Sequence, residues 1–231
     1  MESKTQDKKF NSVRYRNDFI FDNADNIRLD KTVKLIGKNK LVLDVGCGDG
    51  FIMNMIRNLG NKVIGIEIAD SAIKKARKKG FKVYDLSLNS NWSGKIQEKF
   101  DVIFAGEIIE HIFDTDQFLS NIRKVLKKNG KLIITTPNLA TLGRRLMLFV
   151  GQNPLIETTG RSTDAGHIRY FTQGSLCMLL RENGFRVHET TSAVVNFNSS
   201  GKIFSKLMAT IFPTLGNNII VYASKEKQSV K

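Results

Sequence analysis

The chain has 231 residues, 41% of them hydrophobic, and a formal net charge of +14. This length and apolar content fit one sizeable domain with a real core and leave little room for two. No run of about 18 apolar residues is present, so no bilayer-spanning helix is expected. Residues 1–10 lack the apolar stretch of a signal peptide, and two cysteines do not make a disulfide framework. We therefore expect a reducing, cytoplasmic location.

The positive charge favours anionic partners: nucleic acid, an acidic membrane face or a phosphorylated substrate. A lysine-rich composition can also reflect the host's proteome, so the charge alone selects none of these partners. One tract between Gln117 and Ile156 has no acidic residue. Its basic residues are Arg123, Lys124, Lys127, Lys128, Lys131, Arg144 and Arg145.

Short apolar runs alternate with helical patterns along the chain. Strands are expected at residues 40–46, 61–67, 81–85, 100–106 and 131–137. Helices are expected at residues 50–60, 70–80, 115–130 and 172–184, several of them ending at a glycine. Two late strands, at residues 185–192 and 217–224, would form a closing antiparallel pair. The alternation predicts an α/β fold with a doubly wound, mostly parallel sheet, in a single domain whose ends, about 1–12 and 226–231, are frayed.

A glycine-rich loop, LDVGCGDGF at residues 43–51, follows the first strand and opens the first helix. It contains three glycines, Gly46, Gly48 and Gly50, which let backbone amides approach a ligand. Glu67 ends the second strand about 20 residues later, where an acid can bind ribose hydroxyls. The third glycine comes one residue too early for a dinucleotide fingerprint, and Asp44 and Asp49 suit a cation better than a pyrophosphate. These features argue against a nicotinamide oxidoreductase.

The loop resembles the first motif of the class I methyltransferases that use S-adenosylmethionine. The sulfonium and ammonium of that cofactor account for nearby acids, and its carboxylate can meet the loop amides. The resemblance implies a Rossmann-like, seven-stranded sheet with an antiparallel closing strand. It also implies that Glu67 holds the ribose, that Ile68 packs on the adenine and that Asp85 and Leu86 line the adenine pocket. The expected cofactor-binding set is Asp44, Gly46, Cys47, Gly48, Asp49, Gly50, Glu67, Ile68, Asp85, Leu86 and Gly106.

A second stretch, AGEIIEHIF at residues 105–113, follows the fourth strand. Glu107, Glu110 and His111 therefore lie beyond its carboxyl end, where ligands of such sheets bind. Acids at the start of a helix, which favour the helix dipole, are the alternative interpretation. With TTPN at 135–138 and GHIRYFT at 166–172, this stretch resembles the ubiquinone-biosynthesis O-methyltransferases and their uncharacterised relatives.

The same acids and histidine also resemble the small-RNA terminal 2′-O-methyltransferases, which bind a divalent metal with such a set plus a later histidine. His167 is a later histidine here, although the flanking pattern differs from that of the RNA enzymes. The expected catalytic set is Glu107, Glu110, His111 and His167. Two carboxylates and two imidazoles could hold a metal that lowers the pKa of a hydroxyl. Without metal, His111 or His167 would be a general base.

Either route predicts an S-adenosylmethionine-dependent methyltransferase that methylates a hydroxyl on a small or lipid-like acceptor. The alternatives are an RNA 3′-terminal 2′-O-methyltransferase and a non-catalytic S-adenosylmethionine-binding protein. Residues 139–165 and 198–216 are expected to be substrate-side insertions. They either pack on the core or form a lid or an interfacial patch, with Phe149, Phe204, Leu207 and Phe212 as candidate contacts. The segment around Arg144 to Val150 would govern acceptor access or attach to an anionic membrane surface; nucleic acid is less supported.

Overall fold

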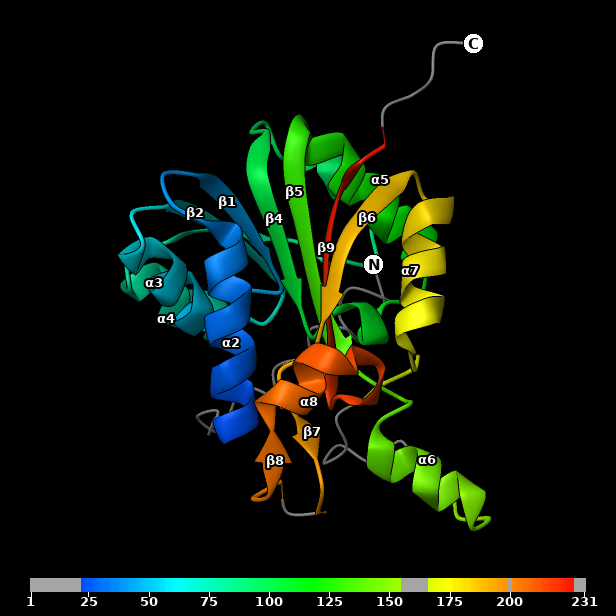
Figure 1. The fold of residues 1–231 in the computed structure, drawn as a ribbon. Helices are drawn as coiled ribbons and strands as arrows, with labels where there is room; N and C mark the ends of the chain where they lie inside the picture. Colours follow the sequence, from blue (N-terminus) through cyan, green and yellow to red (C-terminus); the bar gives the residue numbers. More distant parts are fainter. Residues whose placement is uncertain (1–21, 155–165, 199–200, 227–231) are drawn as a thin grey trace.

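In a computed structural model of the chain, the described residues are 22–154, 166–198 and 201–226. Seven strands form one sheet in the order β3-β2-β1-β4-β5-β9-β6 (Figure 1). The first five strands of the chain pair in parallel, and β9 runs antiparallel between β5 and β6. The predicted fold class is therefore confirmed. The frayed ends expected at about 1–12 and 226–231, apart from residue 226, and residues 155–165 and 199–200 of the expected insertions lie outside the described residues.

The strands of the sheet match the apolar runs of the sequence. They are β1 (Leu41–Val45), β2 (Lys62–Glu67), β3 (Lys82–Asp85), β4 (Phe100–Gly106), β5 (Leu126–Pro137), β6 (Phe185–Thr191) and β9 (Asn218–Lys225). Four consecutive residues are buried in each of β1, β2 and β4. Such runs are typical of parallel strands that are covered on both faces.

Helices cover both faces of the sheet. They are α2 (Asn23–Ile36), α3 (Phe51–Asn58), α4 (Asp70–Lys78), α5 (Thr115–Val125) and α7 (Gln173–Glu182). One core layer joins α2 and α3 to the sheet through Ile36, Ile56 and Phe104. The opposite layer joins α5 and α7 to the sheet and contains Phe118 and Leu180. The core therefore fixes the sheet rigidly and leaves the strand ends open.

Two features differ from the sequence-based expectation. The helix expected at 115–130 ends at Val125, and β5 begins at Leu126, because the Leu126 backbone pairs with Phe100 and its side chain is buried in the core. Helix propensity of the lysine-rich residues 127–128 is thus overridden by sheet pairing. Helix α2 was not expected at all; its mixed pattern includes a buried Arg28.

The segments after β5 and β6 build a separate projection beyond the strand ends (Figure 1). It consists of α6 (Leu142–Phe149), β7 (Val195–Asn196), β8 (Phe204–Ser205), α8 (Lys206–Ile211) and the 3-10 helix η3 (Pro213–Leu215). We call it the apolar foot. Both α6 and α8 contact β7. In the part of the chain that the structure describes, no helix has the length and apolarity needed to cross a membrane.

Candidate active site

A cavity of about 370 Å³ lies at the carboxyl ends of the parallel strands. Each of these strands contributes to its wall: Gly46 follows β1, Glu67 closes β2, Leu86 follows β3, Gly106 closes β4 and Pro137 closes β5. Ligands of doubly wound sheets bind at this edge. The cavity is therefore the candidate binding site.

Most of the predicted cofactor residues line this cavity. They are Gly46, Cys47, Gly48, Asp49, Glu67, Ile68, Leu86 and Gly106. Glu67 is buried and accepts from three backbone amides, those of Gly48 at 3.0 Å, Ile68 at 2.7 Å and Ala69 at 2.9 Å. Its carboxylate thereby ties the glycine loop to the end of β2 and presents a fixed acceptor to the cavity.

Asp44, Gly50 and Asp85 are not among the lining residues. Asp44 is buried in β1, and its Oδ2 atom has no hydrogen-bond partner. Burial and the charge of Glu67 raise the pKa of Asp44 to about 8, so it carries a proton at neutral pH. Gly50 caps α3 in a left-handed conformation. Burial, and then Asp44 and Glu67, raise the pKa of the Cys47 thiol, which fits a loop filler rather than a redox group.

Glu107 begins the loop after β4 in the left-handed region, with φ of 55°, which is uncommon for a residue other than glycine. Its amide donates to Thr135 O at 2.9 Å. Its carboxylate accepts from the Thr135 hydroxyl at 2.8 Å and pairs with the Arg28 guanidinium at 3.2 Å. Glu107 is therefore directed toward α2.

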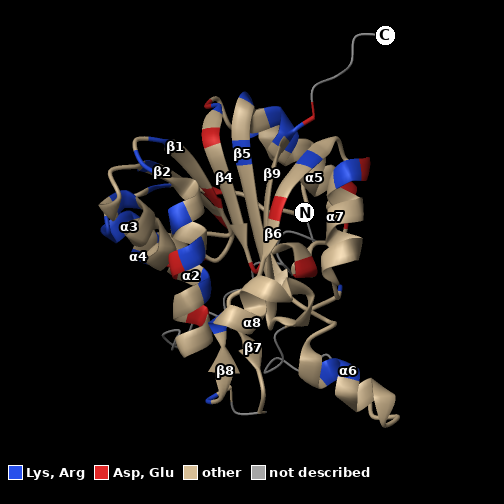
Figure 2. Ribbon diagram, in the orientation of Figure 1, with Lys and Arg blue, Asp and Glu red and all other residues tan. Residues whose placement is uncertain are grey.

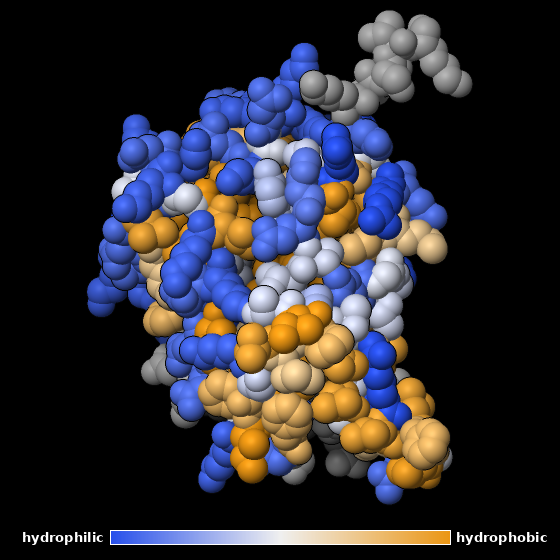
Figure 3. All heavy atoms as spheres, in the orientation of Figure 1, coloured by the Kyte–Doolittle hydropathy of each residue, from blue (hydrophilic) through white to orange (hydrophobic). Residues whose placement is uncertain are grey.

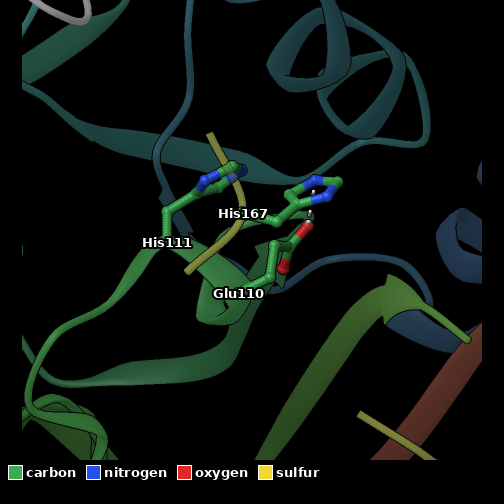
Figure 4. Close-up of side chains that lie close together, drawn as sticks. All are labelled: Glu110, His111 and His167. Carbon is green, nitrogen blue, oxygen red and sulfur yellow. Dashed lines mark ion pairs between the residues drawn. The ribbon is translucent and has the colours of Figure 1, made fainter. Parts of the chain in front are cut away.

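Glu110, His111 and His167 form a close cluster in the cavity wall (Figure 4). One ligand atom from each lies within 4.8 Å of the other two. Glu110 is 2% exposed, and its Oε1 atom is 3.9 Å from His167 Nε2. The two imidazole rings have centroids 4.9 Å apart. This carboxylate and two imidazoles have the chemistry of a divalent metal site or of an acid–base set.

Backbone contacts bring His167 to this cluster from far along the chain. The amides of Ile168 and Arg169 donate to Glu110 O at 3.0 and 3.1 Å, and His111 Nδ1 is 2.9 Å from Gly166 O. All four predicted catalytic residues thus line one cavity, but Glu107 stands apart from the close cluster. Their catalytic roles remain predictions.

Arg28 also lines the cavity, although no motif in the sequence predicts it as a site residue. It is 6% exposed and donates to Asp25 at 2.9 Å. Burial opposes its charge, but Glu107 and Asp25 outweigh this effect and raise the pKa of Arg28. An arginine in an N-terminal helix gives no local signal that it will meet an acid 79 residues later, so only its position within a partly apolar helix could have drawn attention to it.

Comparison with known proteins shows the family. The model of the family described as "Methyltransferase domain" matches residues 36–167, which is more than half of the chain. The chain therefore belongs to this methyltransferase family.

The resemblance to ubiquinone-biosynthesis enzymes is also confirmed. The chain is 37% identical over 123 residues to the ubiquinone biosynthesis O-methyltransferase of Pelagibacter ubique (strain HTCC1062), covering 52% of this chain and 51% of that protein. It is 31% identical over 166 residues to the mitochondrial enzyme of that name from Homo sapiens, covering 67% and 44%. The chain thus spans about half the length of these curated relatives.

Solved structures share the fold. Magnesium protoporphyrin IX methyltransferase from Synechocystis PCC 6803, with bound SAH, aligns with a TM-score of 0.63 at 15% identity, over 96% of this chain and 100% of that one. The 1,6-didemethyltoxoflavin-N1-methyltransferase of Burkholderia thailandensis, with bound 1,6-didemethyltoxoflavin and S-adenosylhomocysteine, also aligns with a TM-score of 0.63 at 15% identity, over 98% and 89%. The fold is therefore the Rossmann-like fold of solved methyltransferases.

Proposed function

We propose that the chain is an S-adenosylmethionine-dependent methyltransferase that methylates a hydroxyl on a small or lipid-like acceptor. One observation carries this proposal: a single cavity joins the glycine loop and Glu67 to the Glu110–His111–His167 cluster. Relatives named for ubiquinone biosynthesis support a lipid-like acceptor.

The cofactor end of the cavity offers complementary groups. The buried Arg28 guanidinium can meet the cofactor carboxylate, since an ionised donor strengthens a hydrogen bond to an anion. The loop amides of Gly46, Cys47, Gly48 and Gly50 donate within the protein and fix the shape of the loop around the cofactor. Glu67 would accept from the ribose hydroxyls while it holds the loop. Ile68 and Leu86 give an apolar surface for the adenine.

The reaction moves a methyl group from the sulfonium to the acceptor oxygen, leaving a neutral thioether. The acceptor hydroxyl loses its proton to His111 or His167, because an imidazole is a suitable general base near neutral pH. Glu110 Oε1 faces His167 and would stabilise the imidazolium that forms. A divalent metal on the same three side chains would lower the pKa of the hydroxyl and orient it.

One measurement identifies the class of acceptor, and a second distinguishes the histidine base from a metal. Methyl transfer from radiolabelled S-adenosylmethionine into lipid, RNA and small-molecule fractions of a cell extract should label the lipid or small-molecule fraction. Label confined to RNA would favour RNA-end methylation instead. If activity survives a chelator while His111→Ala abolishes it, the histidine is a base and no metal is needed.

We further propose that the apolar foot attaches the protein peripherally to an anionic membrane surface. Its exposed large apolar side chains are Leu146, Leu148, Phe149, Val150, Phe197, Ile203, Leu207, Ile211 and Phe212. Figure 3 shows this apolar surface gathered at the end of the molecule that carries α6, α8, β7 and β8. A patch of this extent on a soluble protein marks an interaction surface.

Charge favours an anionic lipid surface over a second copy of the chain. Residues 138–154, 190–198 and 201–225 contain no Asp or Glu. Lys and Arg mark α6 and the region of β8, where Figure 2 shows no acidic residue. Two such cationic faces would repel each other.

Hydrogen bonds join the foot to the end of β5. Arg145 donates to Thr214 O at 3.1 Å, and Asn138 Nδ2 donates to Thr214 O and Gly216 O at 3.0 and 2.8 Å.

Sedimentation with vesicles tests this attachment. The protein should sediment with vesicles of anionic phospholipid at low salt and be released at high salt, because salt screens exposed charges. Phe149→Ser should weaken sedimentation. Met178→Ser is the matched control, because Met178 is also exposed but lies on α7, away from the foot. Equal effects of the two substitutions, or a stable dimer that buries the foot, would contradict the attachment.

A further inference from the structure

The TTPN stretch at residues 135–138 places two buried hydroxyls beside two carboxylates of the site. Thr135 and Thr136 are both 0% exposed. The Thr135 hydroxyl donates to Glu107 Oε1 at 2.8 Å, and the Thr136 hydroxyl donates to Glu110 Oε2 at 3.0 Å. Neither threonine lines the cavity, so each acts on the cavity only through the carboxylate that it holds.

Adjacent residues of a strand point to opposite faces of a sheet, and these two threonines serve different layers. Thr135 faces α2, where its oxygen accepts from Arg28 Nη1 at 3.2 Å while its hydroxyl donates to Glu107. One hydroxyl thus bonds both members of a buried ion pair, whose own Nη1–Oε1 distance is 3.2 Å. Loss of this hydroxyl would remove one hydrogen bond from each member of the pair, and Arg28 would no longer be held in its position at the cavity.

Thr136 faces the other layer, which carries Glu110 in the short 3-10 helix η2 (Ile109–His111). Glu110 is almost fully buried, and Thr136 occupies its Oε2 atom. The remaining oxygen, Oε1, is the one that faces His167 Nε2 at 3.9 Å. The rotation of this carboxylate, and with it the partner that His167 meets, is therefore set by the Thr136 hydroxyl.

We infer that Thr135 and Thr136 are positioning residues with separate tasks. Thr135 holds the Arg28–Glu107 pair for cofactor binding, and Thr136 aims Glu110 at His167 for methyl transfer. The role of Thr135 in cofactor binding rests on the proposed function, whereas the role of Thr136 in positioning Glu110 can be tested without measuring methyl transfer. If both hydroxyls merely filled the core, replacing either one would have the same effect.

Proton NMR of the imidazole Cε1–H groups in the untagged protein tests whether Thr136 positions Glu110 beside His167. The chain has three histidines and hence three such signals. Thr136→Val should shift the His167 signal, and Thr136→Ser should return it toward the wild-type position. Thr135→Val should leave it unchanged. His188 is the internal reference, since it stacks on Tyr222 with ring centroids 4.9 Å apart and bonds Ser224.

Calorimetry with S-adenosylhomocysteine tests whether Thr135 positions the Arg28–Glu107 pair for cofactor binding. Thr135→Val should weaken binding about tenfold, in line with the loss of hydrogen bonds to charged groups, and Thr136→Val should leave it within about twofold. Thr135→Ser should restore binding. If a valine variant does not fold, as judged by circular dichroism, the alanine variant at the same position is used instead, since it also lacks the hydroxyl.

Two results would overturn the inference. One is a His167 signal that does not move in the Thr136 variant; the other is an equal loss of S-adenosylhomocysteine affinity in both variants. If the wild-type protein does not bind S-adenosylhomocysteine, the proposed function fails, and the imidazole signals still decide whether Thr136 positions Glu110.

Discussion

At the scale of single residues, Gly46 shows how closely the glycine loop approaches the loop after β4. Its φ is 79°, and a Cβ atom there would lie 2.2 Å from the Cδ1 atom of Ile108. Gly37 has nearly the same φ, 81°, but nothing within 4 Å of a Cβ atom. The two positions therefore separate the cost of backbone strain from the cost of a blocked cavity.

Gly46→Ala should weaken S-adenosylhomocysteine binding more than tenfold, because Ile108 or the loop must move. Gly37→Ala should leave binding unchanged and cost only backbone strain, about 1–3 kcal/mol of folding stability, because its φ of 81° and ψ of −159° lie in a region that glycine almost alone adopts. Calorimetry and chemical denaturation measure the two effects. Equal binding losses would show that the contact with Ile108 is unimportant.

Asp44 makes the free energy of unfolding depend on pH. Its pKa is about 8 in the folded protein, because of burial and the charge of Glu67, and about 3.9 in an unfolded chain. Between these values the folded state binds more protons, so the free energy of unfolding falls as pH rises from about 4 to 8.

Asp44→Asn removes this titration. The melting temperature of the wild-type protein should therefore fall relative to that of the variant as the pH is raised from 5 to 8. Differential scanning calorimetry across this range measures the change. Parallel curves for the two proteins would mean that Asp44 is ionised in the folded state.

At the scale of elements, α6 is distinctive because none of its residues is buried. Phe149 is 88% exposed, so Phe149→Ser should change the free energy of unfolding by less than about 0.5 kcal/mol. Urea denaturation of the protein in solution measures this. A loss of several kcal/mol would place Phe149 in a packed core and remove the reason to propose a docking role.

Elements also show what the sequence can predict. The strands and most helices follow from apolar periodicity and glycine stops, which are local signals. The end of α5 does not, because Leu126 leaves the helix to pair with Phe100, a contact that only the assembled sheet provides. The same holds for the site: the glycine loop and Glu110–His111 are visible in the sequence, whereas Arg28 joins Glu107 only when α2 packs on the sheet.

At the scale of the whole molecule, the apolar foot and the carboxyl ends of the parallel strands lie toward the same end of the sheet (Figure 1). The cavity is lined by residues at these strand ends. Pro137 lines the cavity and the next residue, Asn138, anchors the foot. A lipid-like acceptor could therefore pass from a membrane surface to the cavity without leaving the vicinity of the foot. The single-domain organisation predicted for residues 1–231 remains a prediction.

The net charge of +14 has a consequence for the molecule as a whole. Association with anionic vesicles should be fast and should weaken steeply as salt rises from about 0.05 to 0.5 M, since the Debye length shrinks over this range. Vesicles of neutral phospholipid should bind far less protein at low salt. Equal binding to both vesicle types would assign the attachment to apolar contacts alone.

Calorimetric titration of the wild-type protein with S-adenosylmethionine, S-adenosylhomocysteine and NAD tests whether the cavity is a site for S-adenosylmethionine. We expect the first two ligands to bind and NAD not to bind. Glu67→Ala should weaken S-adenosylhomocysteine binding by about 1.5–3 kcal/mol, because hydrogen bonds to a charged group are lost. Binding of NAD without binding of S-adenosylmethionine would show that the protein is not an S-adenosylmethionine-dependent methyltransferase.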